Sequence, residues 1–253
     1  MTSNWAAKRQ LILFLIFFAF AAGVIFLIYL KLTAPTCADG RQNQSEEGTD
    51  CGGQCEKECL GEIKNLNVVW SKGFEISKGK YDAVALVENL NLYLAVSKIK
   101  YQLKVYDKDN ILIGIRGGET FINPGETFPI FETNINVGER IPEKFFIEFE
   151  NALNWTIVRK EKPSLVVSSK KFSNTLPFPR LDLTVENKSI FTVENVSAVA
   201  ILYDKDKNAK AASATKIDKI SASDSKNISF TWPQVFMEES FASEAFFRTN
   251  LNK

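Results

Sequence analysis

The residues best suited to chemistry are four cysteines that fall within one short segment. They are spaced as Cys37-x13-Cys51-x3-Cys55-x3-Cys59, and the chain contains no others. Outside the cytoplasm such thiols oxidise, so two disulfides are expected; three connectivities are possible, and the sequence does not choose among them. Four thiolates could instead hold zinc, but x3 spacings are not the usual CxxC pairs. We therefore predict a disulfide-bonded module.

The same segment carries oxygen ligands of the kind that calcium prefers. Asp39, Asn43, Glu46 and Asp50 lie between the first two cysteines. A calcium site at these residues is one hypothesis. The alternative, which we favour, is a polar stalk held by disulfides, whose acids are solvated and which needs no cofactor.

This segment also resembles a known cysteine module. Its residues from Cys37 to Cys55 follow the pattern CxDGxxNQxExGxDCGGxC, which is found beside anchors or at domain edges in many secreted prokaryotic proteins. The resemblance covers only this part of the chain.

Histidine is absent from all 253 residues. This excludes Ser-His-Asp and Cys-His catalysis, histidine-ligated zinc and a histidine general base. The net charge of +1 gives no basic excess of the kind that nucleic-acid binding requires. We predict that the protein is not an enzyme and has no catalytic residues. The remaining enzymatic hypothesis is a glycosidase that uses only carboxylates, which would need two acids facing one cleft.

One apolar stretch determines where the protein lies. Leu11 to Leu30 contains no charge, and a helix of about twenty residues spans the roughly 30 Å core of a bilayer. Lys8 and Arg9 precede it, so the positive-inside bias places the N-terminus in the cytoplasm and the rest outside. A cleaved signal peptide is the alternative, but its apolar core is usually shorter and the sequence after Leu30 is a poor cleavage site.

The remainder of the chain is predicted to be an internal repeat, because matched blocks recur in one order at a nearly constant offset. The blocks are Val68-Val69 with Val166-Val167, Val87-Glu88-Asn89 with Val185-Glu186-Asn187, Tyr106-Asp107 with Tyr203-Asp204, and Ile122 to Thr127 with Ile220 to Ser225. We interpret the repeat as a duplicated domain.

Each copy has the pattern of short strands. Apolar residues alternate with polar ones from Lys98 to Asp107, which is the period of a half-buried strand. About seven such runs in about 95 residues predict an immunoglobulin-like β-sandwich. Asp107 and Asp204 are each expected to cap their own turn.

The copies also resemble bacterial FxLYD-type domains, in which a strand ends in Leu-Tyr-Asp and a Pro-Gly-Glu turn follows. The matching residues are Leu103-Lys-Val-Tyr-Asp107 with Pro124-Gly-Glu126, and Ala200-Ile-Leu-Tyr-Asp204; the second copy lacks Pro-Gly. The resemblance implies an extracytoplasmic binding or spacer fold.

The two copies differ where a function could have been added. Outward-facing Gln102 and Lys104 of the first copy become Val199 and Ile201 in the second. These two residues are predicted either to be covered inside the chain or to form a surface for a partner. The second copy also lacks a counterpart of the first copy's predicted final strand at 154–159, and the resulting open edge could recruit a strand from another protein.

The predicted fold class is therefore mainly β, with one transmembrane helix followed by two tandem sandwiches. The predicted parts are a cytoplasmic stub at 1–10, the helix at 11–31, the cysteine module at 32–62, and domains at 63–160 and 161–253, arranged end to end by the short linker Lys160–Pro163. The predicted function is non-catalytic binding, adhesion or spacing at a prokaryotic envelope. The predicted partners are the lipid bilayer and an envelope protein or anionic surface polymer. The alternative is a subunit of an envelope, pilus or secretion assembly that docks through the second domain.

Overall fold

The chain forms two compact units, residues 1–63 and residues 64–253. The computed structural model describes residues 3–32, 35–46, 48–55, 63–150, 154–237 and 241–252. The first unit contains the only helix in that part of the chain, α1 (Ser3–Leu32). The second unit consists of antiparallel sheets, so the described structure is mainly β, as the sequence predicts.

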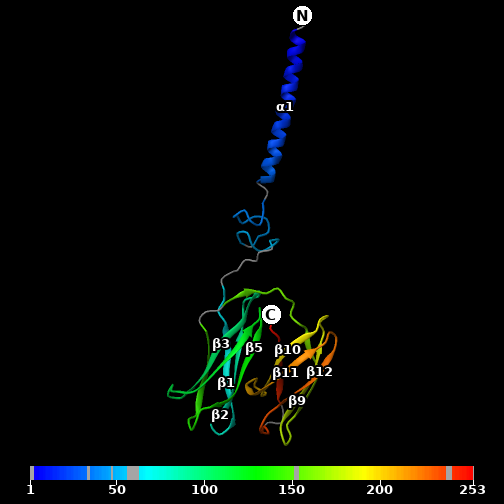
Figure 1. Ribbon diagram of the computed structural model, residues 1–253. Helices are drawn as coiled ribbons and strands as arrows, with labels where there is room; N and C mark the ends of the chain where they lie inside the picture. Colours follow the sequence, from blue (N-terminus) through cyan, green and yellow to red (C-terminus); the bar gives the residue numbers. More distant parts are fainter. Residues whose placement is uncertain are drawn as a thin grey trace. The chain divides into compact units, whose positions relative to one another are not determined.

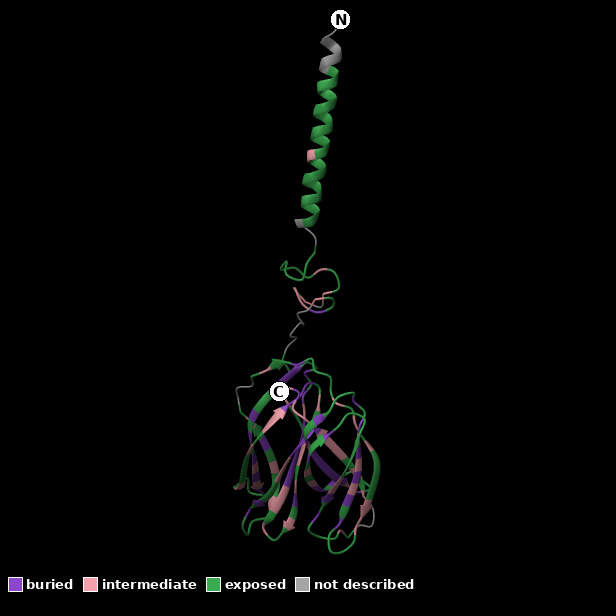
Figure 2. Ribbon diagram, turned by 45° about the vertical axis from the view of Figure 1, so that its right-hand side comes forward, coloured by how far each residue is buried: buried purple, intermediate pink, exposed green. Residues whose placement is uncertain are grey.

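Helix α1 is apolar around its whole circumference between Lys8 and Lys31, and this stretch is long enough to cross a membrane. Figure 2 shows the helix exposed along almost its entire length. A helix that is apolar on every side and exposed over almost all of its described length is stable only in an apolar environment. It could be a membrane anchor or a signal sequence.

In the second unit, the first pair of sheets comprises a sheet of strand order β1-β2-β5 and a sheet of order β4-β3-β6. The strands are β1 (Asn67–Ser77), β2 (Lys80–Glu88), β3 (Leu94–Asp107), β4 (Leu112–Ile122), β5 (Thr127–Asn136), β6 (Pro142–Phe149) and the short β7 (Thr156–Ile157). The predicted alternation in β3 is confirmed: Ile99, Tyr101 and Leu103 are buried in the core, and Lys98 and Lys100 are exposed.

The second pair of sheets repeats this strand order. Its strands are β8 (Leu165–Ser173), β9 (Arg180–Asn187), β10 (Val193–Tyr203), β11 (Ala209–Ile220), β12 (Ser225–Thr231) and β13 (Ala242–Arg248). They form sheets of order β12-β9-β8 and β11-β10-β13. In both pairs, therefore, the first, second and fifth strands make one sheet, and the third, fourth and sixth make the other.

The two pairs lie side by side rather than end to end, so the prediction drawn from the linker was wrong (Figure 1). Sheet β1-β2-β5 packs on sheet β11-β10-β13, and between them lies a cluster that includes Phe74, Val84, Val199 and Ile201. A short linker limits the separation of two domains but does not fix the angle between them. The apolar outer face of β10 decides the arrangement, because it must be covered.

Val199 and Ile201 consequently do not form a surface for another molecule. Val199 is 9 % exposed and Ile201 is 0 % exposed, both under the first pair of sheets. Covering inside the chain, the other alternative, is what the structure has. Strand β2 is buried on both faces for the same reason: Val84 faces this interface, whereas Ala83 and Ala85 face the core of their own pair.

The predicted final strand at 154–159 is mostly absent. Strand β7 has only two residues, and it pairs with Leu94 and Ala95 of β3 rather than with β6. Both β6 and β13 are therefore edge strands of their sheets. The predicted difference between an edge closed in the first copy and open in the second was wrong.

Candidate functional site

The cysteine module is closed by a disulfide between Cys37 and Cys55. Cys51 is disulfide-bonded as well, and Cys59 lies outside the described residues. A disulfide replaces an apolar core in a segment of this size. The expectation that these thiols are oxidised is thus met by the three cysteines that the structure describes.

The four predicted calcium ligands mostly satisfy the backbone of their own loop. Asp39 accepts hydrogen bonds from the Arg41 amide (2.9 Å) and from Asn43 Nδ2 (2.8 Å). The Asn43 bond is the main reason that the pKa of Asp39 lies below its usual value. Both carboxylate oxygens of Asp50 accept from the Gly40 amide, at 2.9 and 3.0 Å.

The remaining acid of this set, Glu46, also bonds to its own loop. Glu46 accepts from the Asn43 amide at 3.1 Å. In the described part of the chain, the one group of three potential metal-ligating atoms within 4.8 Å of one another is Cys37, Glu46 and Cys55. Two of these are joined in the disulfide. In the described residues these acids are thus bonded to the backbone of their own loop, and the calcium site stays a hypothesis.

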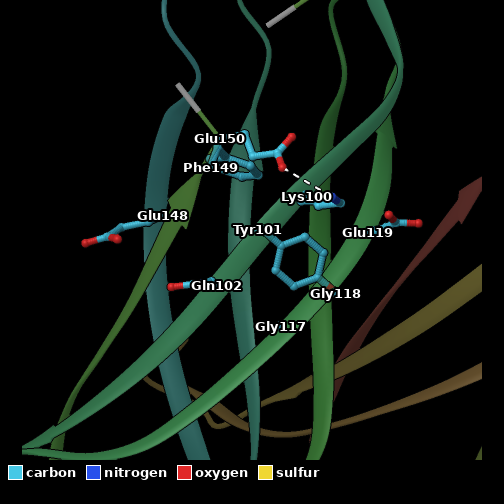
Figure 3. Close-up of a pocket in the computed structure, with 9 residues that line it drawn as sticks. All are labelled: Lys100, Tyr101, Gln102, Gly117, Gly118, Glu119, Glu148, Phe149 and Glu150. Atoms are coloured by element: carbon cyan, nitrogen blue, oxygen red, sulfur yellow. Dashed lines mark ion pairs between the residues drawn. The ribbon is translucent and has the colours of Figure 1, made fainter. Parts of the chain in front are cut away.

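An open hollow of about 670 Å³ lies on the outer face of sheet β4-β3-β6. It exists because Gly117 has no side chain where it pairs with Gln102, which itself pairs with Glu148 on the other side. Figure 3 shows the side chains around it. The lining residues are Lys100, Tyr101, Gln102, Gly117, Gly118, Glu119, Glu148, Phe149 and Glu150.

All three carboxylates of the hollow are paired with lysines of β3. Lys100 Nζ lies 3.7 Å from Glu150, Lys98 Nζ lies 2.8 Å from Glu119, and Lys104 contacts Glu148. Such cross-strand pairs stabilise an exposed sheet face modestly. Glycoside hydrolysis uses two acids that act on one bond, and the glycosidase stays a hypothesis.

Below the hollow, Tyr101 connects the two sheets of the first pair. Its hydroxyl donates a 2.6 Å hydrogen bond to Glu132 Oε1 of β5. Burial, with that bond, raises the pKa of the Tyr101 hydroxyl. Gly118 makes room for this contact, since a Cβ at position 118 would lie 2.3 Å from the Tyr101 hydroxyl oxygen.

Gly118→Ala should therefore destabilise the protein, whereas Gly117→Ala should not. At position 117 an added Cβ meets only the Tyr101 carbonyl oxygen, at 3.7 Å. Moving Tyr101 from Glu132 leaves a buried hydroxyl unpaired, which costs about 1–3 kcal/mol. Chemical denaturation of both variants measures the difference. Equal stabilities would mean that the tyrosine moves without loss of its hydrogen bond.

The seam between the two pairs of sheets contains a buried arginine. Arg248 of β13 is 8 % exposed, and its guanidinium forms an ion pair with Glu126, with Nε 2.7 Å from Oε1. It also donates to the carbonyl oxygen of Phe121 at 2.6 Å. The Arg248 Cζ lies 4.3 and 3.9 Å from the ring centroids of Phe121 and Phe128. Burial lowers the pKa of Arg248, and the ion pair with Glu126 opposes this.

Asn123 continues this seam. Its side-chain Nδ2 donates to the Thr249 carbonyl oxygen at 3.0 Å, and its Oδ1 accepts from the Leu251 amide at 3.1 Å. The turn Asn123 to Glu126 of the first pair thus holds the end of β13. Sequence reasoning missed Arg248 and Glu126. The available signals were an arginine that ends an apolar strand and a Pro-Gly-Glu turn present in the first copy alone.

Two buried asparagines make the same contacts in the two pairs of sheets. Asn89 Nδ2 donates to the carbonyl oxygens of Leu94 and Asn123, and its Oδ1 accepts from the amide of Asn91. Asn187 bonds in the same way. Its Nδ2 donates to the carbonyl oxygens of Phe191, Ile220 and Ser221, and its Oδ1 accepts from the amide of Ser189. Each asparagine fixes the loop that follows its strand.

The turn-capping roles predicted for Asp107 and Asp204 are confirmed. Asp107 Oδ1 accepts from the amides of Asp109 and Ile111 at 3.0 and 2.9 Å. Asp204 Oδ1 accepts from the amides of Asp206 and Asn208 at 2.9 and 2.8 Å. The Ile111 and Asn208 amides are the main reasons that the pKa values of Asp107 and Asp204 are lowered.

The stability of the protein should therefore fall in acid. A carboxylate with a lowered folded-state pKa stabilises the fold above its unfolded pKa of about 4, and this contribution is lost as pH falls through the folded value. The double variant Asp107→Asn, Asp204→Asn keeps one acceptor oxygen, Oδ1, for the amides of each turn but cannot titrate. Denaturation between neutral pH and about pH 2 should show a weaker pH dependence for this variant than for the parent. An unchanged slope would contradict the assignment.

A comparison with protein-family models and with curated proteins finds no match to this chain.

Proposed function

We propose that this chain is a membrane-anchored, extracytoplasmic protein of a prokaryotic envelope that acts without catalysis, as a rigid spacer that presents a binding face. The observation that carries the proposal is the seam between the two pairs of sheets. A buried Arg248–Glu126 ion pair and the apolar layer around Ile201 make the two pairs one block. A spacer needs this rigidity.

Other features support the same proposal. The equal strand order and the matching contacts of Asn89 and Asn187 support a duplicated domain of immunoglobulin-like, FxLYD-type fold. The disulfide-bonded cysteine module supports a location outside the cytoplasm. The polar outer face of sheet β4-β3-β6, with its hollow at Gly117, is the surface that we assign to a polar ligand such as an envelope polymer.

The anchor and its orientation can be tested together. In intact cells, the protein should stay in the membrane after alkaline extraction. A protease added from outside should remove the whole of residues 64–252 and leave a small fragment containing α1. Release by alkali, or protection from the external protease, would contradict the proposed location.

The alternative function, docking of the second domain into an envelope assembly, loses its apolar surface because Ile201 is covered. The exposed edge of β13 is what would remain for it. Crosslinking of the full chain in membranes distinguishes the two: a spacer stays monomeric, whereas an assembly subunit forms a defined oligomer.

A further inference from the structure

One end of the second unit carries apolar side chains on two rigid loops, one from each pair of sheets. Loop 89–93 follows β2 and loop 188–192 follows β9. In the first loop Leu92 is 70 % exposed and Tyr93 is exposed; in the second, Ile190 is 91 % exposed and Phe191 is exposed. Buried Asn89 and Asn187 hold these loops in place, so the side chains are presented outward.

The two loops lie at the same end of the unit. Asn89 donates to the carbonyl oxygen of Asn123, and Asn123 accepts from the Leu251 amide. Thr249, two residues earlier, donates to the Glu194 carbonyl oxygen next to the second loop at 2.9 Å. We call this the tethered end, comprising loops 89–93 and 188–192.

The chain that arrives from helix α1 enters the unit at this end. The Lys64 amide donates to Asn91 Oδ1 at 2.9 Å, and Asn91 Nδ2 donates to the Lys64 carbonyl oxygen at 2.7 Å. Asn91 lies between Leu90 and Leu92. The entering segment is therefore bound to the loop that presents the apolar side chains.

We propose that the tethered end docks on the bilayer in which α1 is anchored, with Leu92, Tyr93, Ile190 and Phe191 in the interfacial layer. This proposal depends on the anchor in the proposed function. Aromatic and aliphatic side chains at loop tips partition into the headgroup region, where aromatic rings are favoured. A covalent tether keeps this end at high effective concentration near the surface, so even weak partitioning suffices.

The opposite end of the unit provides a matched control. Leu176 and Met237, in the loop segments 174–179 and 232–237, are also exposed and apolar. They lie one strand length away, and a strand of 11 residues such as β1 spans about 35 Å. Short-range quenchers in the lipid therefore separate the two ends.

The full chain is reconstituted into phosphatidylcholine liposomes that contain lipids spin-labelled on the acyl chain near the headgroup. An environment-sensitive fluorophore is attached to a single introduced cysteine in each of four variants. Two lie at the tethered end, Leu92→Cys and Ile190→Cys, and two are controls, Leu176→Cys and Met237→Cys. Labelling is done without reductant, and the signal from the parent chain labelled in the same way is subtracted. Docking predicts that the spin-labelled lipid lowers emission roughly twofold at 92 and 190 and leaves 176 and 237 unchanged.

A further variant tests whether the apolar tips cause the contact. With the fluorophore at Leu90→Cys, the pair Leu92→Glu and Ile190→Glu should abolish the quenching, and Leu176→Glu with Met237→Glu should not. If the spin-labelled lipid quenches the fluorophore to the same extent at both ends, in protein that resists alkaline extraction, docking is overturned and the anchor is not. Quenching only at 176 and 237 would also overturn it. Protein that is extracted by alkali would overturn both docking and the proposed function.

Discussion

Arg248→Met should lower the free energy of unfolding by about 3–5 kcal/mol, the usual result of breaking a buried ion pair. The substitution removes the cation that neutralises Glu126, whose side chain is 12 % exposed. Glu126 would then be a largely buried charge without its cation, keeping the hydrogen bond from Asn123 Nδ2. Denaturant titration followed by circular dichroism measures the loss.

Two controls identify the cause. Arg248→Met with Glu126→Gln removes both charges and should recover most of the lost stability, because neutral replacement of a buried pair is often tolerated. Lys78→Met removes a cation from the exposed pair with Glu139 and should leave stability unchanged within error. If the double variant were as unstable as the single one, the arginine would act through packing rather than charge.

Ile201→Asp should separate the two pairs of sheets. Ile201 is fully buried in the layer between them, and truncation to alanine alone at such a site costs about 2–5 kcal/mol. A carboxylate there also has no cation in the apolar cluster. We expect denaturation to change from one transition to two and small-angle scattering to show a larger radius of gyration.

The matched control is Ile115→Asp, which makes the same chemical change at an isoleucine that is 52 % exposed on the outer face of β4. It should leave the single transition intact. Far-UV circular dichroism distinguishes separation from unfolding of Ile201→Asp, because separated pairs keep their strand signal. A compact variant with a single transition would show that the seam does not depend on this layer.

The elements of the fold could be predicted from the sequence, but their mutual packing could not. The alternation in β3 and the continuous apolar stretch in α1 each lie within one segment, so they can be recognised without knowing how the segments pack. Strand β2 gives a continuous apolar run, Ala83 to Val87, which does not say what covers its second face. The apolar outer face of β10 indicated a missing cover, and only the structure identifies β2 as that cover.

The site residues also divide into those with local contacts, which could be predicted, and those with contacts between distant segments, which could not. Asp107 and Asp204 act within their own turns, so local sequence was sufficient to predict their roles. Arg248 and Glu126 are far apart in the chain and meet only because the two pairs of sheets pack together. The acids of the cysteine module were ambiguous in sequence because a capping carboxylate and a calcium ligand are the same side chain.

The contact between the pairs of sheets has a consequence for assembly between molecules. The two faces that meet are different, β1-β2-β5 and β11-β10-β13. A heterologous contact between similar units could in principle propagate into a filament. The corresponding faces that are not used in this contact carry polar residues. Gln102 and Lys104 occupy the positions that match Val199 and Ile201, and Asp182 occupies the position that matches Val84. We therefore expect the contact not to be repeated between chains, because these polar residues would lose their hydration there.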